Sequence, residues 1–278
     1  MPMIDMEHLA QWIGREDHGA ETLTPELAAR FARTLDRESE TGPGAVAPLL
    51  IHLCLAQPVV ATAELAADGH LERGGFLPPV PLPRRMWAGG AFDFSDELRI
   101  GDRIARRSVI EAVKAKTGRS GSLCFVTVKH HFSREGETVL TERQDIVYRD
   151  AGEAASRPAP PRAPIGSDTR TIVPSAPLLF RYSALTFNAH RIHYDAPYAR
   201  EVEGYPGLVV HGPLQATLLV QFAADLAGRR PTRFAFRSNA PVFDTGIVEL
   251  HAREEGESLR LWTAQTGGPV AMEAEATW

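Results

Sequence analysis

The side chains best suited to acid–base chemistry lie together in one short segment, which holds Asn188, His190, Arg191, His193 and Asp195. An imidazole titrates near neutral pH, so His193 is the candidate general base. Asn188 cannot take a proton from water at ordinary pH, but its amide can orient a water molecule and donate a hydrogen bond. The segment therefore predicts a site for acid–base chemistry, in which His193 and Asn188 are the catalytic candidates.

A second feature follows directly, because an apolar stretch that is typical of a buried helix runs from 208 to 226. Turn residues open this stretch, namely Gly204, Pro206, Gly207 and Gly212. The backbone N–H of Gly212, which follows His211, would lie in the first helical turn and lack an intrahelical acceptor. Such a donor can hold an oxyanion, although a glycine here could also simply permit close packing.

Several readings of the polar segment stay open. A buried His193 could be a core histidine that bonds to the backbone. His190 and His193, spaced as H-x-x-H, could form a metal site with Asp195, but the helical zinc pair is spaced by four residues and no third ligand is evident, so we expect no metal. Arg191 could receive a substrate carboxylate or pair with Asp195 or Glu201. Asp195 could supply a carboxylate or cap the segment that follows it.

The run F-N-A-H-R-I-H-Y-D, residues 187–195, resembles the hydratase motif of the MaoC-like (R)-specific enoyl-thioester hydratases. That motif has an Asp where Asn188 stands and a His where His193 stands. The run G-F-L-P-P-V-P-L-P-R-R-M-W-A-G-G, residues 75–90, resembles the N-terminal half of one branch. This branch contains mitochondrial-type 3-hydroxyacyl-thioester dehydratases and the mesaconyl-C4-CoA (3-methylfumaryl-CoA) and itaconyl-CoA hydratases.

The resemblance implies an enzyme that adds water to an enoyl-CoA thioester without a cofactor, since CoA is part of the substrate. The implied substrate is a C5 dicarboxylyl-CoA, itaconyl-CoA or mesaconyl-C4-CoA, which gives citramalyl-CoA. Alternatives are an (R)-3-hydroxyacyl-thioester dehydratase of fatty-acid synthesis, a thioesterase, and a non-catalytic acyl-CoA-binding subunit that the Asn has inactivated. The expected substrate-binding residues are Arg191, His190, His211, Arg84 and Arg85, the last two in a stiff Pro-rich setting.

The resemblance also implies an α+β double hotdog, in which each of two curved antiparallel sheets wraps a long helix. The order of elements agrees, since three strand-like runs at 103–115, 123–132 and 138–148 are joined by turns. Four more follow the 208–226 helix. We expect an N-terminal hotdog at 1–150 that shapes the acyl pocket without catalysing, a Pro-rich linker at 151–168, and a C-terminal hotdog at 169–278 with the motif. His130 and His131 are then not needed for turnover.

Composition limits the remaining possibilities. The net charge of −5 and pI near 6.1 argue against a nucleic-acid partner. No apolar stretch has the length of a membrane span, and the acidic start M-P-M-I-D-M-E-H predicts a cytoplasmic protein. Cys54 and Cys124 lie in apolar runs and are expected to be buried thiols. The expected partner is a small acyl-CoA, and the two hotdog units should pair edge to edge within a chain that further associates as a homodimer.

Overall fold

The computed structural model describes residues 4–118, 121–150 and 160–278. The predicted strands of the N-terminal half are present and longer than expected. The elements of this half are α1 (Met6–Ala10), β1 (Glu16–Thr22), α2 (Pro25–Thr34), the short 3₁₀ helices η1 (Ile51–Cys54) and η2 (Thr62–Glu64), β2 (Arg84–Phe94), β3 (Arg103–Gly118), β4 (Gly121–Arg134) and β5 (Glu137–Arg149).

The C-terminal half repeats a helix-then-strands order, as predicted. Its elements are β6 (Asp168–Ile172), α3 (Ala176–Leu185), the 3₁₀ helix η3 (Arg191–His193), the π-helix η4 (Tyr198–Val202), α4 (Gly212–Ala227), β7 (Arg233–Ser238), β8 (Val248–Glu255), β9 (Ser258–Gln265) and β10 (Val270–Thr277). Of the predicted linker, 151–159 lies outside the described residues and 160–167 forms neither helix nor strand. The domain limits themselves stay predictions.

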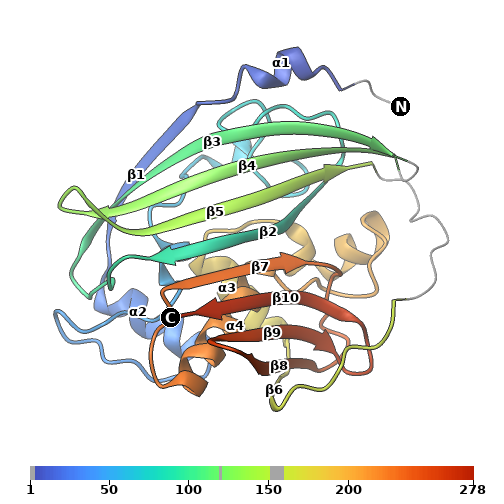
Figure 1. Cartoon of the computed structure of the whole chain (residues 1–278). Coiled ribbons are helices and arrows are strands. Elements are labelled where there is room, and N and C mark those ends of the chain that lie inside the picture. The colour runs from blue at the N-terminus through green and yellow to red at the C-terminus, as the bar shows by residue number, and fades with distance from the viewer. Residues whose placement is uncertain (1–3, 119–120, 151–159) are drawn as a thin grey trace.

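The strands of both halves join into one curved, 10-stranded antiparallel sheet in the order β1-β3-β4-β5-β2-β7-β10-β9-β8-β6 (Figure 1). The two halves meet where β2 pairs with β7, in a register that sets Gly90 opposite Phe236. The double-hotdog fold and the expected edge-to-edge pairing of its two units are thereby confirmed. This junction brings the loops of the N-terminal half beside the polar segment of the C-terminal half.

The helices of the two halves differ in length. In the C-terminal half α4 has 16 residues, ends at Gly228 with a φ of 65°, and packs on the strands β7 to β10. Figure 1 shows α3 and α4 together behind these strands. In the described N-terminal half the longest helix is α2, with 10 residues, whose N-terminal amide at Leu27 donates to the Thr24 hydroxyl over 3.2 Å. The helix α2 ends at Thr34, ahead of the Gly42–Gly44 turn, and Asp36 just beyond its end has a left-handed φ of 53°.

The inward face of β3, β4 and β5 is covered by irregular chain instead. Leu9 of α1 and the buried Val80 and Leu82 of the Pro-rich segment pack there against residues such as Ile110 and Val126. The larger core joins α2, η1 and α4 to both halves of the sheet. Because a loop covers this face where α4 covers the other half, room remains between the loop and the strands.

Two further expectations concern single features. Cys54 and Cys124 are free and buried, and burial raises the pKa of the Cys124 thiol to about 11. None of the described helices is both long and apolar enough to cross a lipid bilayer.

Candidate active site

A cavity of about 1330 Å³ lies between the two halves and is lined by residues from both. Six of the predicted site residues line it: His193, Asn188, Gly212, His190, Arg84 and Arg85. Two predicted substrate-binding residues, Arg191 and His211, are not among its lining residues. The polar segment identified in the sequence therefore faces a cavity large enough for an acyl thioester.

His193 is the last residue of η3 and is 7% exposed. Its Nδ1 lies 2.7 Å from the carbonyl oxygen of Val209. A carbonyl can only accept, so Nδ1 carries the proton and the lone pair of Nε2 is free to take a proton from water. Burial lowers the pKa of His193 to about 4, despite the opposing hydrogen bond to Val209. The imidazole is therefore neutral, as a general base must be, throughout the neutral pH range.

His211 lies behind His193 and positions it. The two rings are stacked with centroids 3.7 Å apart, and Nε2 of His211 lies 2.8 Å from the Ser183 hydroxyl on α3. The side chain is fully buried, and burial with the nearby His193 holds the pKa of His211 well below its ordinary value. A second neutral ring therefore supports the face of the base. This placement is a packing contact with His193, and it differs from the substrate contact expected for His211.

Asn188 follows the end of α3, where its backbone N–H donates to the Ser183 carbonyl over 2.8 Å. Its side-chain Oδ1 accepts the backbone N–H of His190 over 3.0 Å, which closes an Asx turn. The amide Nδ2 has no hydrogen-bond partner among the described residues. Asn188 thus shapes the loop that leads into η3 and also presents an amide at the cavity wall. Its expected role of orienting a water molecule stays a prediction.

Gly212 is the first residue of α4 and lines the cavity. A first-turn N–H has no intrahelical acceptor, and Pro213 supplies no N–H beside it. The ring of Trp87 on β2 lies close by, since a Cβ at Gly212 would stand 3.1 Å from its Cε3 atom. The positive end of α4 therefore meets the cavity at a residue with a backbone donor, and the expected oxyanion role of Gly212 stays a prediction.

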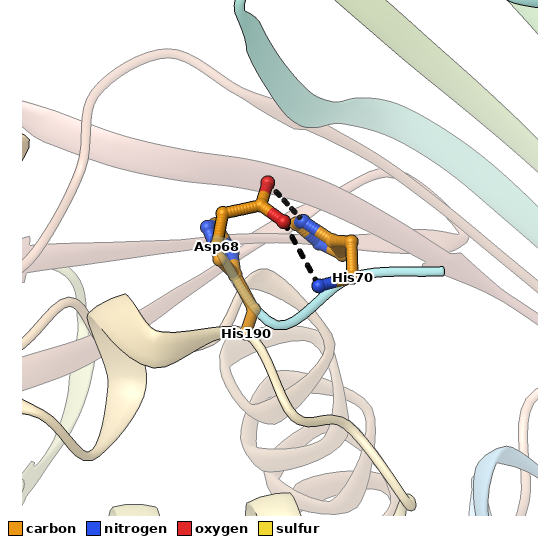
Figure 2. A group of neighbouring side chains, drawn as sticks. All are labelled: Asp68, His70 and His190. Atoms are coloured by element: carbon orange, nitrogen blue, oxygen red, sulfur yellow. Dashed lines mark hydrogen bonds and ion pairs between the residues drawn. The ribbon is translucent and has the colours of Figure 1, made fainter. Parts of the chain in front are cut away.

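The N-terminal half adds a carboxylate and an imidazole that the sequence analysis did not select. Asp68 accepts the His70 Nδ1–H and the His70 backbone N–H, each over 2.9 Å, and Figure 2 shows both contacts beside His190. The rings of His70 and His190 lie 3.9 Å apart, and His190 meets the edge of His193 at 5.4 Å. Although burial opposes it, the bond from His70 holds the pKa of Asp68 well below its ordinary range. A charged carboxylate thus stands near the histidines although position 188 provides none.

The loop that carries these two residues fits tightly against the motif. The Arg191 N–H donates to the Asp68 carbonyl over 2.9 Å. Gly69 has a φ of 88°, and a Cβ at this position would stand 1.8 Å from the Ala189 carbonyl oxygen. Only a glycine lets the two loops approach so closely. The Asp68–His70 pair is therefore held in a fixed place relative to His190.

Arg191 takes the structural alternative that the sequence left open. Its guanidinium bonds to Asp195 over 2.8 and 3.0 Å, to the Ala67 carbonyl over 3.1 Å, and stacks on the Tyr198 ring at 4.0 Å. Asp195 also accepts the Tyr198 N–H over 3.1 Å, as a cap of the next helical segment does. Arg191 and Asp195 therefore fasten the loop, and neither lines the cavity.

Arg84 and Arg85 are placed where a substrate could reach them. They begin β2 rather than ending an irregular segment, and both are half-buried in the cavity wall. Arg84 donates to the Glu203 carbonyl over 3.3 Å and lies over the Tyr205 ring. Contact of these arginines with the phosphates of CoA stays a prediction.

Three side chains could together approach a metal ion, but they are not the set weighed from the sequence. Ligand atoms of Asp68, His70 and His190 lie within 4.8 Å of one another. Asp195 is instead bound to Arg191. Two hydrogen bonds join His70 to Asp68, and His190 meets His70 through a ring contact only. The expectation of no metal stays a prediction.

The residues that the sequence analysis missed share one property, which is that their role depends on a neighbour distant in the chain. Asp68 and His70 form a D-x-H pair, a spacing that lets the carboxylate hold the ring, and this signal was available. Ser183 acts through His211, 28 positions later, and nothing local to Ser183 reveals that contact.

Comparison with solved structures shows the fold. A MaoC-like dehydratase from Phytophthora capsici superposes with a TM-score of 0.73 at 13% identity, covering 99% of this chain and 97% of that one. A Mycobacterium tuberculosis protein described as having a double hotdog fold gives a TM-score of 0.56 at 15% identity, with 95% of each chain covered. These likenesses define the fold of the chain as a double hotdog.

Comparison of sequences shows the family. The model of hydroxyacyl-thioester dehydratase type 2 matches residues 50–244. The chain is 45% identical to the mesaconyl-C(4)-CoA hydratase of Chloroflexus aurantiacus over 95% of both chains. It is 27% identical to the mitochondrial hydroxyacyl-thioester dehydratase type 2 of Schizosaccharomyces pombe over 66% of this chain and 68% of that one. The chain belongs to the hydroxyacyl-thioester dehydratase type 2 family and is an enzyme of the hydratase and dehydratase class.

Proposed function

We propose that this enzyme hydrates a C5 dicarboxylyl-CoA, with mesaconyl-C4-CoA as the first candidate and itaconyl-CoA as the second, to give citramalyl-CoA. One observation carries the proposal: His193 lines the cavity as a neutral base with its proton fixed on Nδ1 by Val209. The identity with a mesaconyl-C(4)-CoA hydratase, 45% over nearly the whole chain, supports the choice of acyl group.

The reaction follows from the two ends of the site. Nε2 of His193 takes a proton from water, and the hydroxide oxygen forms a bond to the β-carbon of the enoyl group. The π electrons move to the thioester oxygen. The Gly212 N–H donates a hydrogen bond to this oxygen and so stabilises its negative charge. The protonated Nε2 then returns its proton to the α-carbon, which restores the thioester carbonyl and the neutral imidazole. The net change is the addition of one water, and no cofactor is required.

Residues of the polar loop assist this cycle without gaining or losing atoms themselves. Asn188 can orient the water through its amide, since its Oδ1 is already bound to the His190 N–H. Burial, with His70 and His193 nearby, lowers the pKa of His190, and the Asp68 carboxylate opposes this only in part; His190 meets the edge of His193. Burial and the nearby His70 also lower the pKa of His193, so the imidazolium that forms during turnover is a strong acid toward the α-carbon.

A second candidate substrate, an (R)-3-hydroxyacyl thioester, is favoured by the match to the dehydratase family and its Schizosaccharomyces pombe relative. Purified enzyme should be mixed with mesaconyl-C4-CoA, itaconyl-CoA and crotonyl-CoA while enoyl absorbance and free thiol are followed together. The proposal expects absorbance to fall fastest with a dicarboxylyl substrate and without thiol release. Thiol release would indicate a thioesterase, a preference for crotonyl-CoA would indicate the dehydratase, and binding without turnover would indicate a non-catalytic subunit.

A further inference from the structure

A line of polar side chains crosses the inward face of the N-terminal strands, far from the motif in sequence. We call it the polar belt: Arg106 and Ser108 of β3, His130 of β4, and Glu142 and Gln144 of β5. Ser108 lies opposite His130 across one strand pair, and His130 lies opposite Glu142 across the next. The inward positions on both sides of His130 along β4, Val128 and Phe132, are buried and apolar. Burying a row of polar groups in such a face costs free energy unless the groups are hydrogen-bonded.

Most charges of the polar belt already have partners. Arg106 is 7% exposed, and its guanidinium bonds to Asp17 over 2.7 Å, to the Ala56 carbonyl over 2.9 Å and to the Ser108 hydroxyl. Glu142 is 1% exposed and accepts the Gln144 amide over 2.7 Å. Nε2 of the fully buried His52 faces a Glu142 carboxylate oxygen at 3.4 Å. The Asp17 and Glu142 charges are therefore compensated within the protein.

Two imidazoles here have ring nitrogens without a hydrogen-bond partner among the described residues: both nitrogens of His52, and Nε2 of His130, which belongs to the polar belt itself. The His130 side chain is 9% exposed and its Nδ1 lies 2.7 Å from the Ser108 hydroxyl. Arg106 donates to that same oxygen, so the Ser108 O–H must point to Nδ1, which is its only acceptor among the described residues. His130 then carries its proton on Nε2, and this buried N–H makes no hydrogen bond in the described part of the chain. The Gln144 amide beside it donates to Glu142 instead.

The polar belt and the catalytic histidine share one cavity. Arg106, His130, Glu142 and Gln144 line the same space as His193 and Gly212. Trp87 beside Gly212 and Phe132, whose ring lies 4.9 Å from that of His52, line this cavity as well. An acyl group whose thioester lies at Gly212 would thus occupy the same cavity that the unpaired donor of His130 lines.

We propose that the polar belt is a subsite for the far end of the acyl group, in which the Nε2–H of His130 binds an oxygen of a terminal carboxyl group. The inference rests on the proposed function and refines its substrate class to acyl-CoA thioesters with a carboxyl-bearing end. An acyl group that ends in a methyl would leave the buried N–H unpaired.

Binding of unreactive, saturated ligands tests the subsite independently of turnover. Calorimetry should compare glutaryl-CoA with valeryl-CoA, and suberyl-CoA with octanoyl-CoA, so that each pair differs in its end and two lengths are sampled. We expect the wild type to prefer the carboxyl-ended member of at least one pair by about 10–100-fold, the usual effect of a buried hydrogen bond to a charged group. His130→Phe, which keeps a ring of similar shape, should remove or reverse that preference.

Neighbouring substitutions separate recognition from simple structure. His131 lies on the opposite face of β4 and does not line the cavity, so His131→Phe should leave the preference unchanged. His130→Gln, whose amide can again donate, should restore part of it. If His130→Phe does not fold, Ser108→Ala, which removes the group that fixes the ring tautomer, should weaken the preference severalfold. Equal affinities in the wild type, or a preference that survives His130→Phe or Ser108→Ala, would overturn the inference.

The same ligands also distinguish this failure from failure of the proposed function. An enzyme that hydrates no enoyl-CoA yet binds carboxyl-ended ligands through His130 would refute the proposed reaction and support the subsite. Conversely, rapid hydration of mesaconyl-C4-CoA with an unchanged rate in His130→Phe, and no ligand preference, would support the reaction and overturn the subsite.

Discussion

Replacing Asn188 by Asp tests how the site works with an amide where the family resemblance leads one to expect a carboxylate. The substitution keeps an oxygen that can accept the His190 N–H, so the turn before η3 should persist. It also adds a negative charge at the cavity wall that Asn188 shares with His193. The perturbation is therefore electrostatic, and its target is the pKa of His193.

The size of the effect follows from the pKa of His193, which burial lowers to about 4 in the wild type. A nearby carboxylate favours the charged imidazole and raises the pKa of His193 by roughly 1–2 units. At pH 5 about 90% of the wild-type base is then neutral, whereas a variant with a pKa of about 6 has only about 10% of its base neutral. Between pH 8 and pH 5 kcat/KM should fall about two- to tenfold in Asn188→Asp and hardly at all in the wild type.

The assay measures how fast the enoyl absorbance of mesaconyl-C4-CoA is lost at pH values from about 4.5 to about 9. Gln11→Glu, at an exposed position outside the cavity, adds the same charge and should leave the profile unchanged. At high pH Asn188→Asp should keep or exceed wild-type activity, because its carboxylate can share the work of the base. Complete loss at every pH in a folded variant would show that the Asn188 amide is itself a required donor and refute this reasoning.

The remaining predictions concern the base, the loop contact, acid stability and assembly. His193→Ala should lower kcat by about 10²–10⁴ in a protein that still unfolds cooperatively, and a smaller loss would remove His193 from its role. Gly69→Ala should lower both kcat and the melting temperature, because its Cβ would meet the Ala189 carbonyl at 1.8 Å; Gly14→Ala, with a similar φ of 85° but open space, is the control for backbone strain alone. Because the folded-state pKa of His193 lies below its unfolded value, its contribution to the free energy of unfolding is complete above about pH 6.5 and declines by about 1.4 kcal/mol per pH unit toward pH 4. Unfolding in urea at pH 7 and pH 5 should show a smaller decline in His193→Gln. Light scattering at micromolar concentration should give the mass of a homodimer, and a monomer would contradict that prediction.

Local signals in the sequence were sufficient for much of the fold. Alternation on β4 identified its inward positions, and Thr24 and Gly228 marked the helix ends that the structure shows. The strands β1 and β6 were not predicted, because they are short edge strands whose residues show no clear alternation. The helix α3 was also missed. It begins with Ser175 as its cap, but its apolar residues do not fall on one narrow face, because Leu179 and Tyr182 are buried between α2 and α4.

For the candidate site, too, some residues could be predicted from the sequence and others could not. The residues of one continuous segment, from Asn188 to Gly212, could be selected because their spacing is visible in the chain. The D-x-H spacing of Asp68 and His70 is also visible, but their place beside His190 is not, since it depends on the contact of Gly69 with Ala189, more than a hundred positions away. The inward place of His130 did follow from the alternation of Cys124, Val126 and Val128. What remained hidden was its partner Ser108 on another strand.

The two halves need each other for chemistry in a way that their separate folds do not reveal. The C-terminal half supplies the base and the helix end at Gly212, but the surface opposite that helix end is Trp87 of β2. The strand β2 is also the one that pairs with β7, so the same strand joins the sheets and forms a wall of the cavity. Because a Pro-rich loop covers the inward face of β3 to β5, where α4 covers the other half, space is left beside that wall. The shorter N-terminal helix therefore leaves the space in which, under the proposed function, the N-terminal half would hold the acyl group while the C-terminal half acts on it.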